Sequence, residues 1–471
     1  MDEKIRYNFP DESVHKDPQN YSVFAGKSLP SFIKDYLIKR YTDDFGYLDR
    51  NSILNFLEQH IPSKDNDIKN RLRTHREEIS ILSRFIVETD LKNDKLLFSI
   101  PDLGIKSSEG KIPDHIAKKH PELKDGELWG VITLVYQPPL GKEKGYVELI
   151  NYKAFKPYRV DLEYYRNARK EFSTAEWVDL LIRSMEYNPD GFESLSQKLM
   201  FLSRILIFLE PRLNLIELAP KGTGKSYIFG NLSKYGWMIS GGKVTRAKLF
   251  YDMTKKSMGA ITLYDFVTMD EIQTITFSDA DELKAALKSY LESGNTTIAN
   301  VKLTSRAGLI IMGNIALSRD KKPLKSKYFV ELPEVFKESA LLDRFHGFIE
   351  GWKLPRINED LKIKGWTLNV EYFSEILHEL REKSNYASIV SELLNVPIKA
   401  DTRDTTAIKR LATAYLKLLF PHVSEISDVD KEEFKNFCLM PAIDKRHIIR
   451  QQIHLIDEEF SDEVPDIQII D

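Results

Sequence analysis

A phosphate-binding loop is the clearest chemical signature in the sequence. The segment follows the apolar run RLNLIEL (212–218) and reads Ala219, Pro220, Lys221, Gly222, Thr223, Gly224, Lys225, Ser226. The Walker A pattern is a glycine, four residues and then Gly-Lys-Ser or Gly-Lys-Thr, so Ala219 replaces the first glycine and the rest fits. Gly222 and Gly224 let backbone amides turn toward phosphates, and a helix expected next adds its positive N-terminus. We therefore predict that Lys225 binds the phosphates of ATP and that Ser226 offers its hydroxyl to Mg²⁺.

Two acidic residues close a second apolar run, LYDFVTMDE (263–271), downstream of this loop. By itself the pair could be a helix cap after a buried strand. Its position after a Walker A loop favours a Walker B motif instead. In that interpretation Asp270 holds Mg²⁺ through its water shell, and Glu271 acts as the general base toward the attacking water.

A third apolar run, AGLIIMGN (307–314), ends in Asn314. Asparagine at the end of a strand is often only a turn former. Here three strands would end in polar groups, and ligands of open α/β sheets bind at the edge where the carboxyl ends of the strands meet. We therefore expect Asn314 beside the γ-phosphate, where it helps to place the water.

Composition narrows the class of protein without naming its substrate. The chain has 471 residues, 68 basic and 71 acidic side chains, and a formal net charge of -3, so any DNA-binding surface has to be local. The single cysteine, Cys438, excludes a disulfide framework and indicates a reducing cytoplasm. The N-terminus lacks an apolar leader, and no run of about 18 apolar residues predicts a membrane span.

The residue patterns predict four regions. Residues 1–185 are expected to form an α+β N-terminal domain, with helices near 31–41, 52–61 and 64–90 and strands at KLLFSI, LWGVITLVY and YVELINYKAF. An α/β P-loop core is expected over 186–355 and a helical region over 356–456. The strongest helix of the region 356–456 is predicted at 400–420, with Thr402 or Asp404 as its cap. The acidic tail 457–471 is expected to be solvated or disordered.

Taken together, the motifs resemble those of the BrxL family, the Lon-related ATPases of BREX phage-defence systems. The resemblance is carried by LIELAPKGTGKS, SGGKVT (240–245), the Walker B run, YLESG (290–294), MGN (312–314) and LLDRFHGFIEGWKLP (341–355). It implies an AAA+ core, an αβα sandwich with a helical lid. It also implies a homo-oligomer, a hexameric ring or a stacked double ring. Longer family members carry a Lon-like Ser-Lys protease domain after the ATPase. The sequence leaves no room for one here, so protease activity is not expected.

The family's core is similar to that of the MCM replicative helicases, and this similarity implies roles for two arginines. Arg344, in LLDRF, matches the arginine finger, and Arg403, in TRDTTAIKRLATA, matches the sensor-2 position. An arginine beside the γ-phosphoryl group stabilises the charge of the transition state. Arg344 could instead be a structural salt bridge, and Arg403 an exposed helix charge.

The segment SGNTTIANVKLTSRA (293–307) predicts two short strands before the third apolar run. The resemblance implies a hairpin in the pore of the ring, with Lys302 and Arg306 as sequence-nonspecific contacts to DNA phosphates and Lys243 as a further candidate. An ATPase that translocates on or encircles DNA is the main hypothesis. A protein unfoldase and a nucleotide-switched scaffold are alternatives. No aromatic residue occurs between Gly294 and Gly308, which favours DNA over a gripped peptide.

The Walker B interpretation predicts a specific defect for Glu271→Gln. The variant should keep ATP bound but hydrolyse it about 10²- to 10⁴-fold more slowly, because an amide cannot accept the proton of the water. Nucleotide affinity and phosphate release, measured side by side, test this. Loss of ATP affinity would make Glu271 a structural or metal-binding residue instead.

Overall fold

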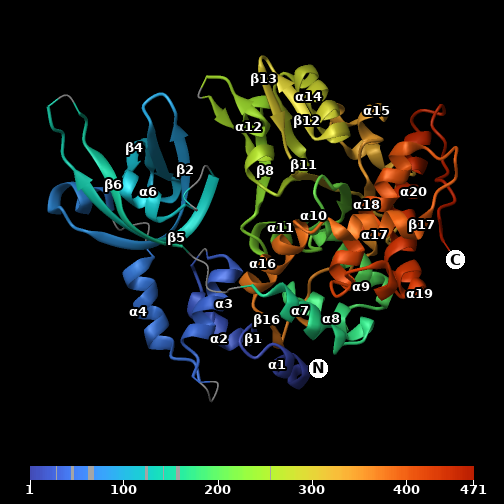
Figure 1. The fold of residues 1–471 in the computed structure, drawn as a ribbon, viewed down its shortest axis with the longest axis horizontal. Coiled ribbons are helices and arrows are strands. Elements are labelled where there is room, and N and C mark those ends of the chain that lie inside the picture. The colour runs from blue at the N-terminus through green and yellow to red at the C-terminus, as the bar shows by residue number, and fades with distance from the viewer. Residues whose placement is uncertain are drawn as a thin grey trace. The chain divides into compact units, whose positions relative to one another are not determined.

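The computed structural model describes residues 1–27, 29–43, 47–61, 68–121, 123, 126–141, 143–154, 160–254 and 256–470. They form two compact units (Figure 1). The core unit comprises Met1–Pro18, Gly26–Tyr36 and Val160–Asp471, and the barrel unit comprises Gln19–Ala25 and Leu37–Arg159. This division differs from the predicted boundary at residue 185. The core unit takes the first residues of the chain as well as the helices that follow residue 160.

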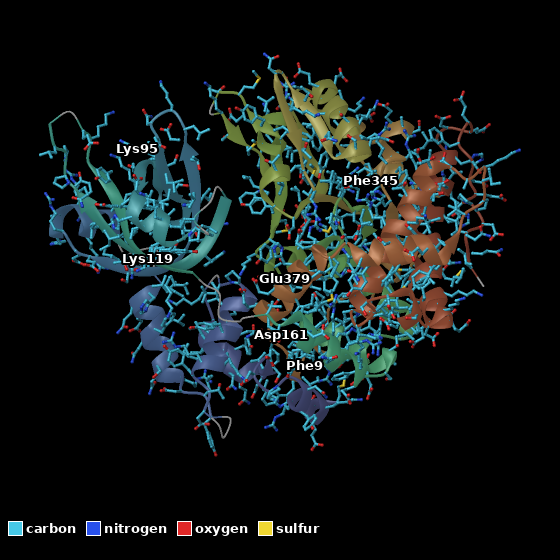
Figure 2. The ribbon with its side chains drawn as sticks, viewed as in Figure 1. Phe9, Lys95, Lys119, Asp161, Phe345 and Glu379 are labelled. Atoms are coloured by element: carbon cyan, nitrogen blue, oxygen red, sulfur yellow. The ribbon has the colours of Figure 1, made fainter. Side chains whose placement is uncertain are left out.

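Long-range packing explains why those segments belong to the core unit. Trp177 lies in α8 (Thr174–Ser184), is fully buried and donates its indole N–H to the Leu418 carbonyl at 3.1 Å. Phe9, labelled in Figure 2, packs against Tyr165 and Tyr372 with ring centroids 6.1 and 6.4 Å away. Strand β1 (Ser13–Lys16) pairs with β16 (Gly365–Leu368). Contacts between residues this far apart in the sequence produce no local residue pattern from which the domain boundary could be predicted.

The barrel unit is a closed sheet of five strands. These are β2 (Ile79–Asp90), β3 (Lys95–Ile100), β4 (Ile105–Ile112), β5 (Gly126–Gln137) and β6 (Tyr146–Ala154), closing in the order β2-β3-β4-β6-β5. All pairs are antiparallel except β4 with β6. Helix α6 (Asp114–Lys119) connects β4 to β5. Alternate side chains, such as Phe85 and Phe98, fill the interior, as a half-buried strand pattern requires.

The three strands predicted in this unit are confirmed, as are helices α3 (Ser31–Arg40) and α4 (Arg50–His60). The helix predicted over 64–90 is wrong from Arg76 onward, because helical structure ends at His75 and β2 begins at Ile79. In β2 the alternate residues Ile79, Ile81, Phe85 and Val87 are buried in the barrel core, whereas Glu88 is exposed. Residues 64–67 of that prediction lie outside the described residues.

A parallel sheet of five strands forms the centre of the core unit. Its strands are β7 (Asn214–Ala219), β8 (Gly236–Val244), β11 (Phe266–Phe277), β14 (Gly308–Asn314) and β15 (Gly347–Glu350), in the order β15-β7-β14-β11-β8. Every described pair in this sheet is parallel. All six residues of β7 are buried, as expected for a parallel strand covered on both faces. The predicted α/β class is thus observed for this unit.

Further helices precede the C-terminal region in the described part of the chain. Besides α3, α4, α6 and α8 these are α1 (Asp2–Asn8), α2 (Pro18–Tyr21), α5 (Ile68–Asn70), α7 (Leu162–Lys170), α9 (Leu195–Leu202), α10 (Leu206–Leu209), α11 (Lys225–Asn231), α12 (Arg246–Leu249), α13 (Ala260–Leu263), α14 (Ala280–Ser293) and α15 (Ser339–Leu342). Two hairpins add β9 (Tyr251–Asp252) with β10 (Ser257–Met258), and β12 (Asn295–Ile298) with β13 (Val301–Thr304). The second hairpin confirms the two short strands predicted before the third apolar run.

The C-terminal region is helical, as predicted. It contains α16 (Val370–Arg381), α17 (Asn385–Leu393), α18 (Thr402–Leu419), α19 (Lys431–Phe434) and α20 (Met440–His454). Helix α18 begins at Thr402, which is one residue earlier than a cap at Thr402 would give. Asp401, rather than Thr402 or Asp404, accepts from the backbone N–H groups of residues 403 and 404. Among the described residues, every helix is too short or too polar to cross a membrane.

The expectation of a solvated or disordered tail holds for most of residues 457–466, which are exposed, but not for the residues that follow. Strand β18 (Gln468–Ile469) pairs antiparallel with β17 (Leu394–Asn395), and Ile467 is buried. The acidic residues 457–466 lie mostly exposed on the way to this strand, so composition alone concealed a short segment that pairs.

Candidate nucleotide-binding site

The Walker A loop connects the carboxyl end of β7 to helix α11. Gly222 and Gly224 have φ of 84° and 79°, a left-handed conformation that favours glycine. A Cβ on Gly224 would lie 2.3 Å from the Tyr187 hydroxyl, so this close approach also requires glycine. The Ile357 N–H donates to the Gly222 carbonyl at 2.8 Å. Neighbouring segments therefore hold the loop in its curled form.

Lys225 is only 8% exposed, and its ammonium group lies 3.2 Å from the Ala219 carbonyl and 3.5 Å from the Asn314 side-chain oxygen. Burial lowers the pKa of Lys225; the Arg204 guanidinium adds to this, while Glu217 and the Walker B carboxylates oppose it. The hydrogen bonds described for the ammonium group are long, 3.2 to 3.5 Å, and go to uncharged oxygens, so an anionic ligand in direct contact would stabilise it further.

The Walker B acids lie on the neighbouring part of the same sheet edge. The Ser226 hydroxyl donates to the Asp270 carboxylate, which is buried and also accepts from the Glu271 N–H at 2.8 Å. The prediction that the strand ends at these acids is wrong, because β11 continues to Phe277. It forms a bulge between Asp270 and Ile275 instead, with Glu271 at a φ of 50°. The bulge turns the exposed Glu271 side chain out of the strand pattern.

Asn314 ends β14 and pairs with Ala219, the last residue of β7. The structure therefore brings Lys225, Ser226, Asp270 and Asn314 to one edge of the sheet, as the sequence predicted. Gln273 also belongs here, because its side-chain amide bonds the backbone of Asn314. No spacing rule in the sequence pointed to Gln273.

A buried ion pair lies beneath the loop, and sequence reasoning missed it. Arg204 and Glu217 are both fully buried, with guanidinium-to-carboxylate distances of 2.5 to 3.2 Å. Arg204 also donates to the Thr223 carbonyl at 2.7 Å, which fixes the loop between its two glycines. The signal was available: Glu217 interrupts a buried apolar strand, and a carboxylate in that position needs a cation.

Arg344 and Arg403 lie together, but not at this edge. Both form ion pairs with Glu292, at 2.8 and 3.1 Å. Arg344 also donates to the Ala340 carbonyl. Two residues after Arg344, His346 exchanges hydrogen bonds with the backbone of Asn214, the first residue of β7. The pair is therefore at the amino edge of the sheet, on the order of 15 Å or more from the Walker A loop, given the rise of a six-residue strand.

A network of buried charges fixes the position of the arginine pair. Asp343 is 2% exposed and accepts from Arg446 at 2.6 Å and from Arg403 at 3.0 Å. Arg446 and Arg450 both donate to Asp404 in α18, at 2.6 and 2.7 Å. A cavity of about 290 Å³ opens beside this network. Its lining residues are Leu291, Glu292, Asp343, Arg344, His346, Asp401, Thr402, Arg403, Thr406 and Ala407.

The three candidate DNA contacts have different surroundings. Lys302 is exposed on β13, two residues after the turn of the hairpin, and Lys243 is exposed near the end of β8. Arg306 lies beyond the hairpin and pairs with Glu382 at 2.9 Å. Its charge is partly compensated within the chain, which weakens its case as a phosphate contact.

Comparison with known proteins adds to this geometry. A family model described as "Lon-like protease BrxL-like, ATPase domain" matches residues 147–466, and one described as "BREX system Lon protease-like protein BrxL N-terminal" matches residues 7–136. The chain belongs to the BrxL family. Two relatives named Lon-like protease BrxL are each 27% identical to this BrxL-family chain. The one from Escherichia coli O9:H4 (strain HS) aligns over 96% of this chain and 64% of its own length, and the one from Bacillus cereus (strain H3081.97) over 98% and 68%. The chain thus spans about two thirds of the length of these relatives.

The residues at the carboxyl edge fit a nucleotide with its divalent cation. The Ser226 hydroxyl and the Asp270 carboxylate lie in direct contact, which is the oxygen pair that Mg²⁺ of a bound nucleotide needs. The buried ammonium of Lys225 supplies the positive charge for phosphate oxygens. Mg²⁺, when bound, would neutralise charge on the phosphates.

The buried ion pair predicts a large cost for breaking it on one side. Arg204→Met should lower the free energy of unfolding by about 3–5 kcal/mol, because Glu217 would remain buried without a cation. Urea denaturation measures this loss. The double variant Arg204→Met/Glu217→Leu is the matched control and should recover most of it. Equal urea midpoints for Arg204→Met and the unchanged chain would contradict the interpretation.

Proposed function

We propose that this BrxL-family chain is a ring-forming AAA+ ATPase of a BREX phage-defence system that couples ATP hydrolysis to binding or movement along DNA. The convergence of Lys225, Ser226, Asp270 and Asn314 at one edge of a parallel sheet carries the proposal. Family membership supports the ATPase assignment, because the matching model is that of an ATPase domain.

Each residue has a distinct role in the proposed hydrolysis. Lys225 binds the β- and γ-phosphates, and Ser226 and Asp270 hold the magnesium ion with its water shell. Glu271 accepts a proton from the attacking water, and Asn314 orients that water beside the γ-phosphate. These groups position and polarise the reactants, which is what phosphoryl transfer needs most from a protein.

The arginines complete the site of a neighbouring copy. Arg344 and Arg403 lie at the opposite edge of the sheet from their own Walker A loop, so in one chain they cannot contact the γ-phosphate. A ring places that edge of one subunit against the nucleotide of the next. Glu292 pairs with both guanidinium groups in the single chain and would have to share them with the phosphates on assembly.

The DNA half of the proposal is supported by two exposed features. Lys302, on the β12–β13 hairpin, has no aromatic neighbour in the hairpin of the kind that grips peptides. The barrel unit is a small five-stranded barrel, an architecture that often binds oligonucleotides. Just before β2 the chain carries the exposed residues Arg73, His75 and Arg76. An unfoldase or a switched scaffold would show no stimulation of turnover by DNA.

Mixing two inactive variants tests the shared site. Lys225→Ala removes the phosphate charge and Arg344→Ala removes the finger, so each alone should lose hydrolysis by about 10³-fold or more. Mixed together, they should regain part of the activity at boundaries where an intact loop meets an intact arginine. Arg319→Ala, at an exposed arginine outside the cluster, serves as the control. A monomer with full ATPase activity at micromolar concentration would rule out the shared site.

The hairpin makes a prediction about salt. Lys302→Ala should weaken DNA binding equally for all sequences and make affinity less dependent on salt, because fewer counterions are released. Arg306→Ala should have a smaller effect, since Glu382 already pairs with it. Fluorescence anisotropy across a salt series, together with basal turnover, measures both. Unchanged DNA affinity in Lys302→Ala would move the contact to another surface.

A further inference from the structure

The hydrogen-bond ladder between β11 and β14 ends before the carboxyl edge of the sheet. Its last described pair joins Met269 to Ile311, after which β11 enters its bulge. Strand β14 continues for three more residues to Asn314, paired there only with β7 among the described strands. The side of Asn314 that faces β11 therefore needs a partner other than a neighbouring strand.

The Gln273 side chain supplies that partner. Its amide nitrogen donates to the Asn314 carbonyl at 2.7 Å, and its amide oxygen accepts from the Asn314 N–H at 3.2 Å. One side-chain amide thus bonds both backbone groups of a single residue, as a neighbouring strand would otherwise do. The ladder is continued by a side chain across the bulge.

Gly313 makes room for this contact. A Cβ at position 313 would lie 2.7 Å from the Gln273 amide nitrogen and 2.9 Å from its oxygen. The φ of Gly313 is not in the left-handed region, so backbone conformation does not require glycine there. A Cβ at this position would instead displace the Gln273 amide or the Leu218 side chain, so glycine leaves the amide its place.

We infer that Gln273 is a positioning residue for hydrolysis, which fixes the direction of the Asn314 side chain relative to Glu271. The inference rests on the proposed function. Glu271 and Gln273 lie on one bulge, whose shape the Thr274 hydroxyl supports by donating to the Glu271 carbonyl at 2.9 Å. The group that activates water and the group that orients it are therefore held by the same irregularity, the four residues 271–274.

Removal of the Gln273 side chain should lower the rate of hydrolysis but leave stability and nucleotide binding almost unchanged. Gln273 is exposed, so water can replace its hydrogen bonds when the side chain is removed. The direction of Asn314 would then no longer be fixed, and small misplacements of groups around a reacting centre reduce rates by about 10- to 100-fold. Lys225 and Asp270, which bind the nucleotide and its cation, are not contacted by Gln273 through any described hydrogen bond.

The test uses the full chain and two independent changes. Gln273→Leu removes both hydrogen bonds at similar volume, and Gly313→Ala displaces the amide while leaving Gln273 in place. Each should lower kcat for ATP about 10- to 100-fold, with KM, nucleotide affinity and melting temperature close to those of the unchanged chain. Gln451→Leu, on an exposed position of α20, is the matched control and should leave kcat unchanged.

A double-mutant cycle separates positioning from a general structural effect. If Gln273 acts through Asn314, then Gln273→Leu/Asn314→Ala should be no slower than Asn314→Ala alone. Multiplied losses in the double variant, or full kcat in Gln273→Leu, would overturn the inference. Either result leaves the proposed ATPase intact as long as Lys225→Ala abolishes turnover. Absence of turnover in the unchanged chain, with DNA and in oligomeric form, would instead overturn the proposed function.

Discussion

Parallel alignment of the five central strands is the constraint on which the other features depend. Because every described strand runs the same way, all carboxyl ends meet at one edge and all amino ends at the other. The first edge carries Lys225, Asp270 and Asn314, and the second carries Arg344 and Arg403. A single chain cannot bring these two sets together without breaking the sheet. In the proposed ring, two neighbouring copies would bring both sets to one nucleotide.

Buried ion pairs hold the backbone at both edges. At the carboxyl edge, Arg204 joins Glu217 in β7 to the carbonyl of Thr223 in the loop. At the amino edge, Arg446 joins Asp343 to Asp404 and also donates to the Phe345 carbonyl at 2.7 Å. Such pairs bring little net stability, because desolvation offsets their attraction. Their effect here is geometric, since each guanidinium bonds a backbone carbonyl next to a proposed functional residue.

The first residues of the chain reach the helix that follows the loop. Lys16 is 3% exposed and pairs with the carboxylates of Asp35 and Glu186, at 2.8 Å for the latter. These carboxylates raise the pKa of Lys16 although burial acts in the opposite direction. Glu186 also accepts from Tyr227, the residue after Ser226, and Tyr227 bonds Ser31 at 2.8 Å. Hydrogen bonds and ion pairs thus connect the helix after the phosphate loop to the N-terminal segment.

Sequence by itself determined the sites whose spacing is local. The Walker A loop, the acid pair of β11 and Asn314 each belong to one strand and the turn after it, so residue types and order were enough. Three strands of the barrel unit were also predicted, from runs rich in β-forming residues. Strand β4 was not predicted, and β2 was taken for part of a charged helix.

Only the tertiary structure decided which distant groups meet. Arg204 with Glu217, Gln273 with Asn314, and Glu292 with both Arg344 and Arg403 are contacts between segments that no sequence period connects. The same holds for the pairing of β17 with β18, which orders a tail that composition marked as solvated. A motif records the backbone conformation of one segment. The partner of a buried charge, or of a backbone group left by a bulge, depends on how separate segments pack together.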